Sequence, residues 1–384
     1  MPHESGNEHQ DQPHPADEPA APVVPAYGPA RLRRSRHRKR KRALRWIAGG
    51  ALGLTLVGGG GVAYAWQHLN GNIKGTDVDA ALGSDRPDEQ HGGAMNILLL
   101  GSDSRAGTHG EYGSGVMGAR ADTAMVLHVD KDHKKASVVS IPRDTEVDRP
   151  TCETSHGDVQ AAHKAVFNSS YALGGPACTV KTVEKMSGVR MDHYLEVDFK
   201  GFQKMIDELG GVDVTTRDAI HDSNSGLSLD SGKHRLKGED ALALVRTRHG
   251  VGDGSDLGRI QLQQAFIKAL IQRADTVDPL GSPSKSYALA DTATKSISAD
   301  SELASADKLL GLAKELKGIS PDRTSMATLP VTYDAQDAGR VLPLEKASHQ
   351  VWKALRHDQP IPKKATQDSV GDRTDSPVVS GAGA

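Results

Sequence analysis

The sequence predicts an α/β domain attached to one N-terminal transmembrane helix, and three observations carry that prediction. Hydrophobic residues make up 37% of the 384 residues but aromatic residues only 4%, so Leu, Val, Ile and Ala must form the core in close-packed layers. Residues 96–100 (NILLL) form a short apolar run stopped by Gly101, which is typical of a central strand buried on both faces. Residues 46–66 contain no charged side chain and are long enough to cross a bilayer.

The N-terminal apolar segment and the basic residues before it predict membrane anchoring. As a helix, residues 46–66 reach roughly 30 Å, about one hydrocarbon thickness, and a Trp stands at each end. Residues 31–45 carry about ten Lys and Arg with no acidic residue. Because basic residues are retained on the cytoplasmic side, we expect a cytoplasmic N-terminus and an extracytoplasmic domain. A signal peptide cleaved after residues 63–65 (AYA) is the alternative, and it also exports the domain.

Composition divides the chain into five segments. We expect residues 1–45 to be a disordered basic cytoplasmic tail and residues 46–66 to be the transmembrane helix. A polar extracytoplasmic stalk at residues 67–94 leads to one folded domain at residues 95–357. Residues 358–384 lack hydrophobic periodicity, and we expect a second disordered tail there.

Hydrophobic patterns predict the main elements of the folded domain. Residues 123–129 and 136–141 have the pattern of strands, and the charged turn between them predicts antiparallel pairing. Asp198 can cap a helix that ends at Gly210 and Gly211. Three later helices are expected at residues 258–273, 301–317 and 344–355, with one strand at residues 325–329.

The two cysteines, Cys152 and Cys178, both fall in the predicted extracytoplasmic part. An oxidising compartment favours a disulfide between them, and two unrelated buried thiols are the alternative. The chain-entropy model gives roughly 3 kcal/mol of stabilisation for a loop of about 26 residues. No CxxC or Cys/His spacing indicates a zinc site.

Pairs of arginine and aspartate stand where three predicted strands begin or end, which is where α/β proteins usually place functional residues. The pairs are Asp103 with Arg105 after the first strand, Arg120 with Asp122 before the second, and Arg143 with Asp144 after the third.

Two later motifs add polar side chains to this set. Arg246 and Arg248 stand at alternate positions, so in an extended segment both face the same way. Arg259 and Gln263 are four residues apart and hence lie on one face of a helix. Arginine forks bind phosphate oxygens bidentately and keep their charge. Several arginines together with carboxylates therefore indicate a pyrophosphate ligand.

Mg²⁺ is the cation that best fits such a site. It commonly takes one or two protein carboxylates and completes its coordination with waters and substrate phosphates, so Asp103 and Asp122 are the candidate ligands. Ordinary surface ion pairs are the alternative for any single arginine or aspartate, and spacing alone does not refute it. Ser-His-Asp catalysis has less support, because no GxSxG or similar nucleophile motif occurs.

Seven blocks of the sequence, taken in order, resemble the LytR-CpsA-Psr family: NILLLGSDSR, RADTAMVLHVD, ASVVSIPRDT, FNSSYALGG, VDFKGFQKMIDELGGVDV, LKGEDALALVRTRH and DLGRIQLQQAF. The resemblance covers residues 95–270 and continues more weakly to residue 355. It implies a three-layer α/β/α domain with a mixed central sheet and an apolar pocket for a polyprenyl chain. Members of the family transfer glycopolymers from a polyprenyl pyrophosphate carrier to peptidoglycan with Mg²⁺, and some also hydrolyse the carrier pyrophosphate.

By motif position, the resemblance places Asp103 and Asp122 at the metal. Catalysis would involve Asp122, Arg143, Arg246 and Arg248, and substrate binding would involve Arg105, Arg120, Arg259 and Gln263. Three departures from the family pattern are a Gly-rich insertion at residues 107–118, Val166 where Lys is frequent, and Leu262 where Arg is frequent. They leave the loop conformation and the contacts of the outer phosphate open.

We therefore expect a Mg²⁺-dependent phosphotransferase of the cell membrane. Its expected partners are a polyprenyl pyrophosphate-linked glycopolymer, a peptidoglycan acceptor and membrane lipid. The alternative is a membrane protein that binds lipid pyrophosphate or regulates without turnover, since the same arginines would serve binding alone. Residues 31–45 could neutralise nucleic-acid phosphates, but the adjoining apolar segment favours lipid headgroups. The base for the attacking hydroxyl stays open between Asp122, Asp144 and none.

Overall fold

The computed structural model describes residues 60–89, 92–103, 121–155, 157–249, 251, 254–276, 282–367, 369–371 and 378–380. Residues from Ala63 onward form one compact unit. The predicted cytoplasmic tail, most of the predicted transmembrane segment and the site candidates Arg105 and Arg120 lie outside the described residues. Within these ranges, no helix is long and apolar enough to cross a membrane.

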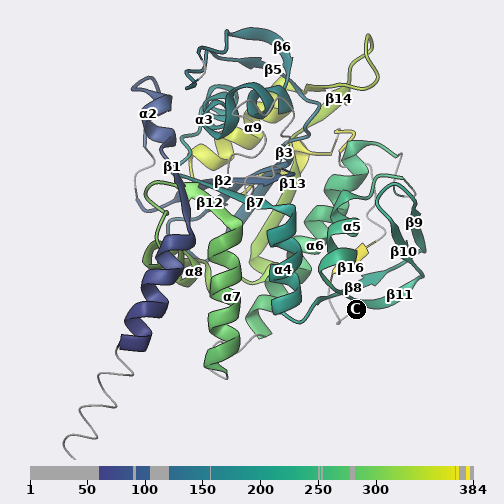
Figure 1. Cartoon of the computed structure of the whole chain (residues 1–384). Coiled ribbons are helices and arrows are strands. Elements are labelled where there is room, and N and C mark those ends of the chain that lie inside the picture. Colours follow the sequence, from purple (N-terminus) through teal and green to yellow (C-terminus); the bar gives the residue numbers. More distant parts are fainter. Residues whose placement is uncertain are drawn as a thin grey trace, which may run out of the picture. The chain divides into compact units, whose positions relative to one another are not determined.

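A mixed seven-stranded sheet forms the centre of this unit and confirms the predicted α/β class (Figure 1). In spatial order its strands are β1 (Lys74–Thr76), β12 (Ile297–Asp300), β7 (His193–Asp198), β2 (Met95–Ser102), β3 (Ala121–Val129), β4 (Ala136–Ser140) and β13 (Thr324–Thr328). β3 pairs antiparallel with both β2 and β4, as the charged turn predicted. β2 pairs parallel with β7, and β4 pairs parallel with β13.

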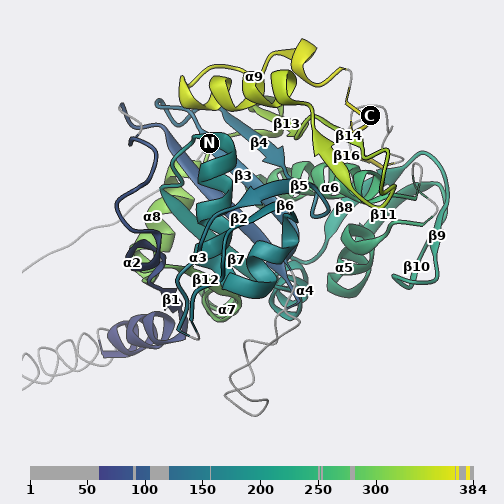
Figure 2. The same cartoon turned by 90° about the horizontal axis from the view of Figure 1, so that it is seen from above.

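Helices cover both faces of the sheet, which explains the unbroken apolar run in β2. Leu98 contacts the core on the face covered by α2 (Val78–Leu82), α3 (Asn168–Ser187) and α9 (Glu345–Arg356) (Figures 1 and 2). Its neighbour Ile97 contacts the core on the opposite face, which is covered by α8 (Ala306–Leu316). α4 (Phe199–Glu208) and α7 (Pro283–Ser296) pack against each other below the sheet in Figure 1.

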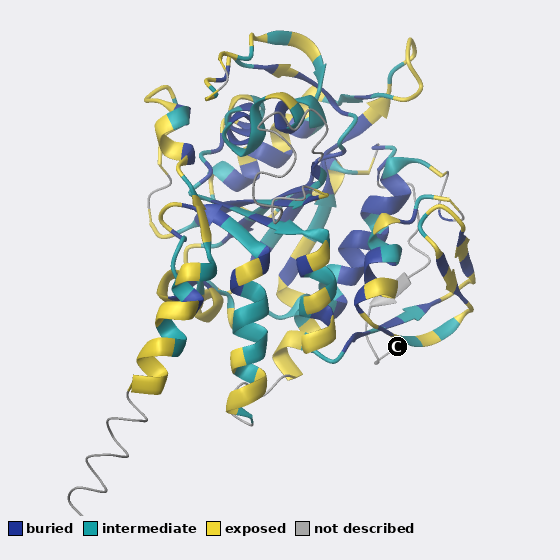
Figure 3. Ribbon diagram, viewed as in Figure 1, coloured by how far each residue is buried: buried dark blue, intermediate teal, exposed yellow. Residues whose placement is uncertain are grey.

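A second core lies beside the sheet, between helices and a small antiparallel β layer. Its elements are α5 (Gly238–Arg246), α6 (Asp256–Thr276), β8 (Val212–Thr216), β9 (Ile220–Asp222), β10 (Leu227–Leu229), β11 (Gly232–Leu236) and β16 (Val378–Ser380). α6 belongs to both cores, with Ile260 in the first and Phe266 in the second. The inner faces of α5 and α6 are accordingly buried (Figure 3). Because α6 contributes to both cores, it connects the small β layer to the central sheet.

Local signals predicted several element ends. Asp198 caps α4 and accepts a 2.8 Å hydrogen bond from the N–H of Gly201, while Gly210 and Gly211 follow with positive φ angles. α8 begins at Ala306, later than the expected residue 301, because Ser305 caps it by accepting a hydrogen bond from the N–H of Lys308. β13 and α9 agree with the expected ranges to within one residue at each end.

The fold begins earlier than the expected boundary at residue 95. β1 lies in the expected stalk and extends the central sheet by pairing with β12. Asn72 Nδ2 donates to Asp291 Oδ1 (3.0 Å), and Arg86 Nη2 donates to the buried Glu184 Oε1 (2.7 Å). These contacts are polar, and the five-residue helix α2 adds only two buried apolar residues, Val78 and Leu82, so hydrophobic periodicity could not reveal this part of the fold.

The fold also continues past residue 357 into the expected C-terminal tail. β16 pairs with β8, and Ala365 in the short 3₁₀ helix η2 (Lys363–Ala365) is buried. Gln261 Nε2 donates a 2.7 Å hydrogen bond to the carbonyl oxygen of Gly371. β16 joins the sheet through backbone pairing with β8, and such pairing leaves no hydrophobic periodicity in the sequence.

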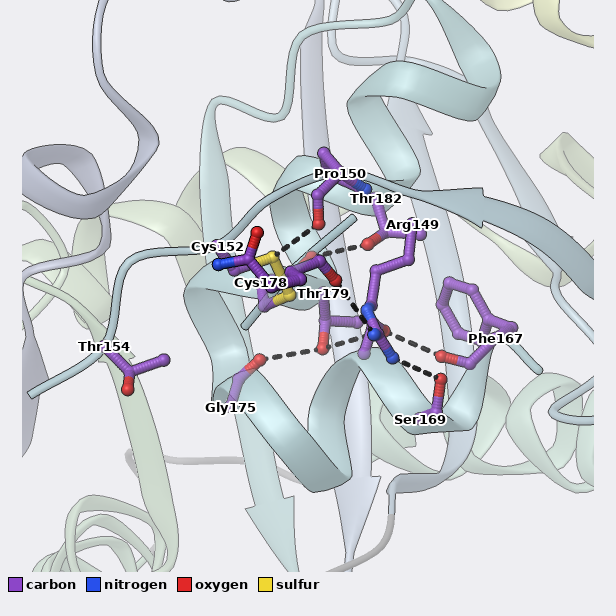
Figure 4. Close-up of a disulfide and its surroundings, with 12 residues drawn as sticks. Arg149, Pro150, Cys152, Thr154, Phe167, Ser169, Gly175, Cys178, Thr179 and Thr182 are labelled. Carbon is purple, nitrogen blue, oxygen red and sulfur yellow. Dashed lines mark hydrogen bonds between the residues drawn. A yellow bond between two sulfur atoms is a disulfide. The ribbon is translucent and has the colours of Figure 1, made fainter. Parts of the chain in front are cut away.

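The predicted disulfide between Cys152 and Cys178 is confirmed, with Cα atoms 5.3 Å apart (Figure 4). It fixes the segment after β5 (Glu146–Arg149) to α3, and β5 forms a hairpin with β6 (Ala162–Val166). Beside the disulfide, Arg149 Nη1 donates to Ser169 Oγ at 3.0 Å.

A second hairpin is formed by β14 (Val331–Tyr333) and β15 (Val341–Pro343), and its strand β15 contacts β5. The 3₁₀ helix η1 (Pro321–Arg323) precedes β13.

Candidate functional site

The ends of three neighbouring strands bring the predicted residues to one edge of the sheet. Ser102 at the end of β2 pairs with Ala121 at the start of β3, and the register then skips Asp122. This bulge leaves Asp122 outside the regular pairing, an arrangement that often redirects a side chain beside a functional site. Arg143 follows the end of β4 and joins Asp122 directly.

Arg143 lies between two aspartates from the predicted set. Its Nη1 donates to Asp122 Oδ1 at 2.8 Å, and its Nε donates to Asp144 Oδ2 at 3.3 Å. Burial lowers the pKa of Arg143, but the negative charges of Asp144, Asp256 and Asp122 outweigh it, and the pKa is raised. The two aspartates therefore keep the guanidinium charged and fix its orientation.

A buried carboxylate, Asp256, is the centre of the arginine cluster. Its Oδ1 lies 2.5 Å from Arg259 Nη2, 3.4 Å from Arg248 Nη2 and 3.8 Å from Arg143 Nε. Neither oxygen has a well-aligned hydrogen bond within the described part of the chain, so the contacts are ion pairs. Burial raises the pKa of Asp256, and the charges of Arg259, Arg248 and Arg143 oppose that rise.

Asp256 was not among the residues predicted for the site, although it belongs to the DLGR block. The signal that could have found it is its spacing of three residues from Arg259 at the start of a helix. The first turn of α6 is packed closely, since a Cβ atom at Gly258 would lie 3.0 Å from the carbonyl oxygen of Val251. This packing keeps Asp256 facing the strand ends.

Arg259 and Gln263 share one helical face, as predicted, and both contact the start of β3. Arg259 Nη2 donates to the carbonyl oxygen of Asp122 at 2.7 Å. Gln263 Nε2 donates to Thr123 Oγ1 and to the carbonyl oxygen of Val245, both at 2.9 Å. Both side chains are buried. Burial lowers the pKa of Arg259, and the charge of Asp256 opposes this.

Arg246 and Arg248 do not face the same way, which corrects the expectation of an extended segment. Arg246 is the last residue of α5, and its guanidinium lies over the Phe199 ring, 5.3 Å from the centroid. Of these two arginines, only Arg248 forms an ion pair with Asp256. The helix continues through Arg246 because Ala241 and Leu244 pack into the second core, and the chain becomes extended only afterwards.

Asp103 directly follows β2, whose end is held by a buried carboxylate that the sequence reasoning missed. Ser102 Oγ and Tyr194 OH form short hydrogen bonds to Glu196, and Tyr171 OH donates to Glu196 Oε1 at 2.7 Å. Glu196 lies on β7 beside β2. The only signal in the sequence is an acidic residue between the apolar Leu195 and Val197.

The donor set fits a cation that needs few protein ligands. In the described ranges, no group of three or more His, Cys, Asp or Glu side chains is placed to hold a metal ion. Asp103 and Asp122 lie at the same edge of adjacent strands, and Arg143 occupies Asp122 Oδ1. Two carboxylates suit Mg²⁺, which takes one or two and fills its other positions with waters and phosphates.

Comparison with known proteins decides the family. The family model "LytR_cpsA_psr family" matches residues 65–357. The chain belongs to the LytR-CpsA-Psr family.

Curated LytR-CpsA-Psr relatives include proteins of the cell wall. "Cell wall biosynthesis protein LcpA" of Corynebacterium glutamicum is 30% identical over 73% of this chain, which spans 59% of that protein. "Polyisoprenyl-teichoic acid--peptidoglycan teichoic acid transferase TagT" of Bacillus subtilis is 34% identical over 64% of this chain and 76% of its own length. "Regulatory protein MsrR" of Staphylococcus aureus is 34% identical over 55% of this chain and 56% of its own length.

Solved structures share the LytR-CpsA-Psr fold. A "LytR-Csp2A-Psr enzyme from Actinomyces oris" has a TM-score of 0.56 at 23% identity and covers 74% of this chain and 96% of its own. A structure titled "TagT bound to LIIa-WTA" has a TM-score of 0.52 at 26% identity, with 72% and 95% covered. The first of these supports the fold alone.

One cavity formed by described residues differs from the apolar pocket that the LytR-CpsA-Psr resemblance implied. That cavity, of about 1140 Å³, is lined largely by charged residues such as Arg86, Lys131 and Glu184. Lys131 follows the end of β3, whereas Asp122 lies near its start, so the cavity is at the opposite edge from the arginines. Between the sheet, α3 and α9, side chains such as Val126, Val180 and Trp352 form a packed core.

Proposed function

We propose that the protein is a membrane-anchored, Mg²⁺-dependent phosphotransferase that moves a glycopolymer from a polyprenyl pyrophosphate carrier to peptidoglycan in cell-wall biogenesis. Family membership and the transferase named TagT support the reaction class. The observation that carries the proposal is the convergence of Arg143, Arg248 and Arg259 on Asp256, next to Asp122.

The cluster suits a pyrophosphate because its cations are held in place before any ligand arrives. Three guanidiniums lie within 4 Å of one carboxylate oxygen, and a fourth group, Asp122, fixes Arg143. Donors already oriented toward developing charge need no reorganisation during reaction, which is the main source of electrostatic catalysis. Arginine forks also match the geometry of phosphate oxygens.

The reaction is a displacement at phosphorus. A hydroxyl oxygen of the wall acceptor forms a bond to the phosphorus that carries the glycopolymer. The bond from this phosphorus to the bridging oxygen breaks, and polyprenyl monophosphate leaves. The hydroxyl proton passes to a carboxylate such as Asp122 or Asp144, or to solvent. Asp103 and Asp122 would hold Mg²⁺, which neutralises phosphate charge when bound.

Membrane anchoring places this site near its lipid-linked substrate. The basic residues 31–45 followed by the uncharged residues 46–66 support a single span with a cytoplasmic N-terminus. The Cys152–Cys178 disulfide supports an oxidising, extracytoplasmic location. Polyprenyl-linked glycopolymer, peptidoglycan and membrane lipid are then the partners, and we propose no role for nucleic acid.

The test is a transfer assay with the purified full chain, a polyprenyl pyrophosphate-linked glycopolymer, peptidoglycan and Mg²⁺. We expect polymer attached to peptidoglycan, polyprenyl monophosphate released, and loss of both on chelation of Mg²⁺. Release of polyprenyl monophosphate without an acceptor would establish pyrophosphatase activity as well. Tight binding of the carrier with no turnover would instead favour the alternative, a membrane protein that binds lipid pyrophosphate or regulates without turnover. The name of the relative "Regulatory protein MsrR" is in line with that alternative.

A further inference from the structure

A second buried aspartate, Asp222, holds the segment that carries Arg248. Asp222 ends β9 and is 3% exposed. Its Oδ2 accepts hydrogen bonds from the backbone N–H groups of Arg248 (3.0 Å) and His249 (3.2 Å). Its Oδ1 accepts a hydrogen bond from the N–H of Asn224 (2.9 Å). One carboxylate therefore joins the β9–β10 hairpin to the chain that leaves α5.

The backbone N–H groups of Arg248 and His249 depend on Asp222 for a hydrogen-bond acceptor. α5 ends at Arg246, and Thr247 has an extended conformation, so the helical hydrogen-bond series stops there. In the described part of the chain, the N–H groups of Arg248 and His249 have no other acceptor. A contact between Ser225 Oγ and Thr247 Oγ1 at 2.7 Å closes the same junction.

The charge of Asp222 matters to this arrangement. Burial raises its pKa, but hydrogen bonds from the backbone N–H groups of Arg248, Asn224, His249 and Ser225 outweigh burial, and the pKa is lowered. A carboxylate offers two acceptor oxygens, and bonds to an ionised acceptor are the stronger ones. An asparagine side chain has the same shape, but its NH₂ group would replace one of the two acceptor oxygens. A donor would then face the backbone N–H donors at that position.

We propose that Asp222 is a positioning residue for Arg248, and that it acts from the β9–β10 hairpin by fixing the backbone from which the guanidinium reaches Asp256 and the substrate pyrophosphate. This inference rests on the proposed function. Asp222 itself does not touch substrate, because its carboxylate is buried and both oxygens are engaged.

The test is a double-mutant cycle on the full chain with Asp222→Asn and Arg248→Ala. Asp222→Asn should lower kcat/KM about 10-fold in the native background but hardly at all beside Arg248→Ala, where nothing remains to be positioned. The matched control is Asp213→Asn, which removes an exposed carboxylate paired with Arg235 in the same β layer and should change little in either background.

A second measurement does not depend on activity. In Asp222→Asn, hydrogen exchange should become faster in peptides covering residues 247–249 and stay unchanged in those covering α6. If Asp222→Asn fails to fold, Asp222→Glu keeps the charge and displaces it by one methylene, and the same non-additivity with Arg248→Ala is expected.

The outcomes distinguish a failure of the Asp222 inference from a failure of the proposed transferase function. An equal loss from Asp222→Asn in both backgrounds, or no loss in either, overturns the inference and leaves the transferase intact. A native chain that transfers no polymer overturns the proposed function, and the exchange measurement then still tests the anchoring of residues 247–249. Unchanged exchange there overturns the inference on its own.

Discussion

Asp256 Oδ1 lies 2.5 Å from Arg259 Nη2, and both side chains are largely buried. The same oxygen faces Arg248 and Arg143. This single carboxylate therefore lies close to three cations that the sequence places in three separate motifs, and Arg143 is also paired with Asp122 and Asp144. Its removal affects both the fold and the site, since the arginines would repel one another and the buried Arg259 would lose the charge that offsets its desolvation.

Asp256→Asn should destabilise the protein by about 3 kcal/mol, because it leaves Arg259 buried without its partner. Urea unfolding of the native and variant chains measures this. The control is Asp337→Asn, whose partner Arg340 and own carboxylate are both well exposed and whose loss should cost under about 1 kcal/mol. Equal stability of Asp256→Asn and the native chain would show that the cluster contributes nothing to the fold.

Asp122→Asn should lower transferase activity steeply while the fold persists, because it keeps the shape of the side chain and removes its charge. Higher Mg²⁺ should recover part of the activity if Asp122 binds the ion. The control, Asp132→Asn, changes an exposed residue in the turn between β3 and β4 and should be nearly silent. Activity of Asp122→Asn equal to that of the native chain would refute the metal assignment.

Arg248→Ala should lower kcat about 10³-fold, by analogy with arginines that stabilise transferring phosphoryl groups. Arg246→Ala should lower it far less, because Arg246 lies over Phe199 rather than beside Asp256. Steady-state kinetics of both variants under the same Mg²⁺ concentration make the comparison. Equal losses would mean that Arg246 turns toward the substrate when it binds.

Reduction of the Cys152–Cys178 disulfide should lower the free energy of unfolding by roughly 3 kcal/mol, because the bridge restricts the unfolded chain. Urea unfolding with and without reductant measures the loss. The double substitution of both cysteines by serine should behave like the reduced protein and should not respond to reductant. Non-reducing peptide mapping of exported protein that finds both thiols free would contradict the structure.

The His193–Asp300 pair should make stability depend on pH. His193 Nδ1 lies 3.3 Å from Asp300 Oδ2. Burial lowers the pKa of His193, but the attraction of the nearby Asp300 carboxylate outweighs burial, and the pKa is raised. The stabilisation is therefore fully present below the ordinary histidine pKa of about 6.5 and is lost as pH rises through the raised value.

Melting temperatures of the native chain and His193→Gln test this pair. Their difference should be larger near pH 6 than near pH 9, taking about 6.5 as the unfolded pKa. His163→Gln is the control, because His163 pairs with Asp148 while 91% exposed and should give a small difference at either pH. A constant difference for His193→Gln across the range would exclude the linkage.

Much of the fold could be predicted from neighbouring residues. The apolar run of β2, the charged turn between β3 and β4, and the cap at Asp198 are local signals, and each met the expected structure. β1 and β16 could not be predicted in this way. Each is a short edge strand held by backbone pairing with a distant strand, β12 or β8, and such pairing leaves no periodic pattern of its own.

In the candidate site too, some residues could be predicted from the sequence and others could not. Asp103, Asp122 and Arg143 were predictable because strands that pair with one another end at one edge of the sheet. Asp256, Asp222 and Glu196 were not predicted, because the partners that surround them come together only in the folded chain. A buried carboxylate is tolerated where the partners that satisfy it converge, and those partners come from segments that packing, rather than sequence order, brings together.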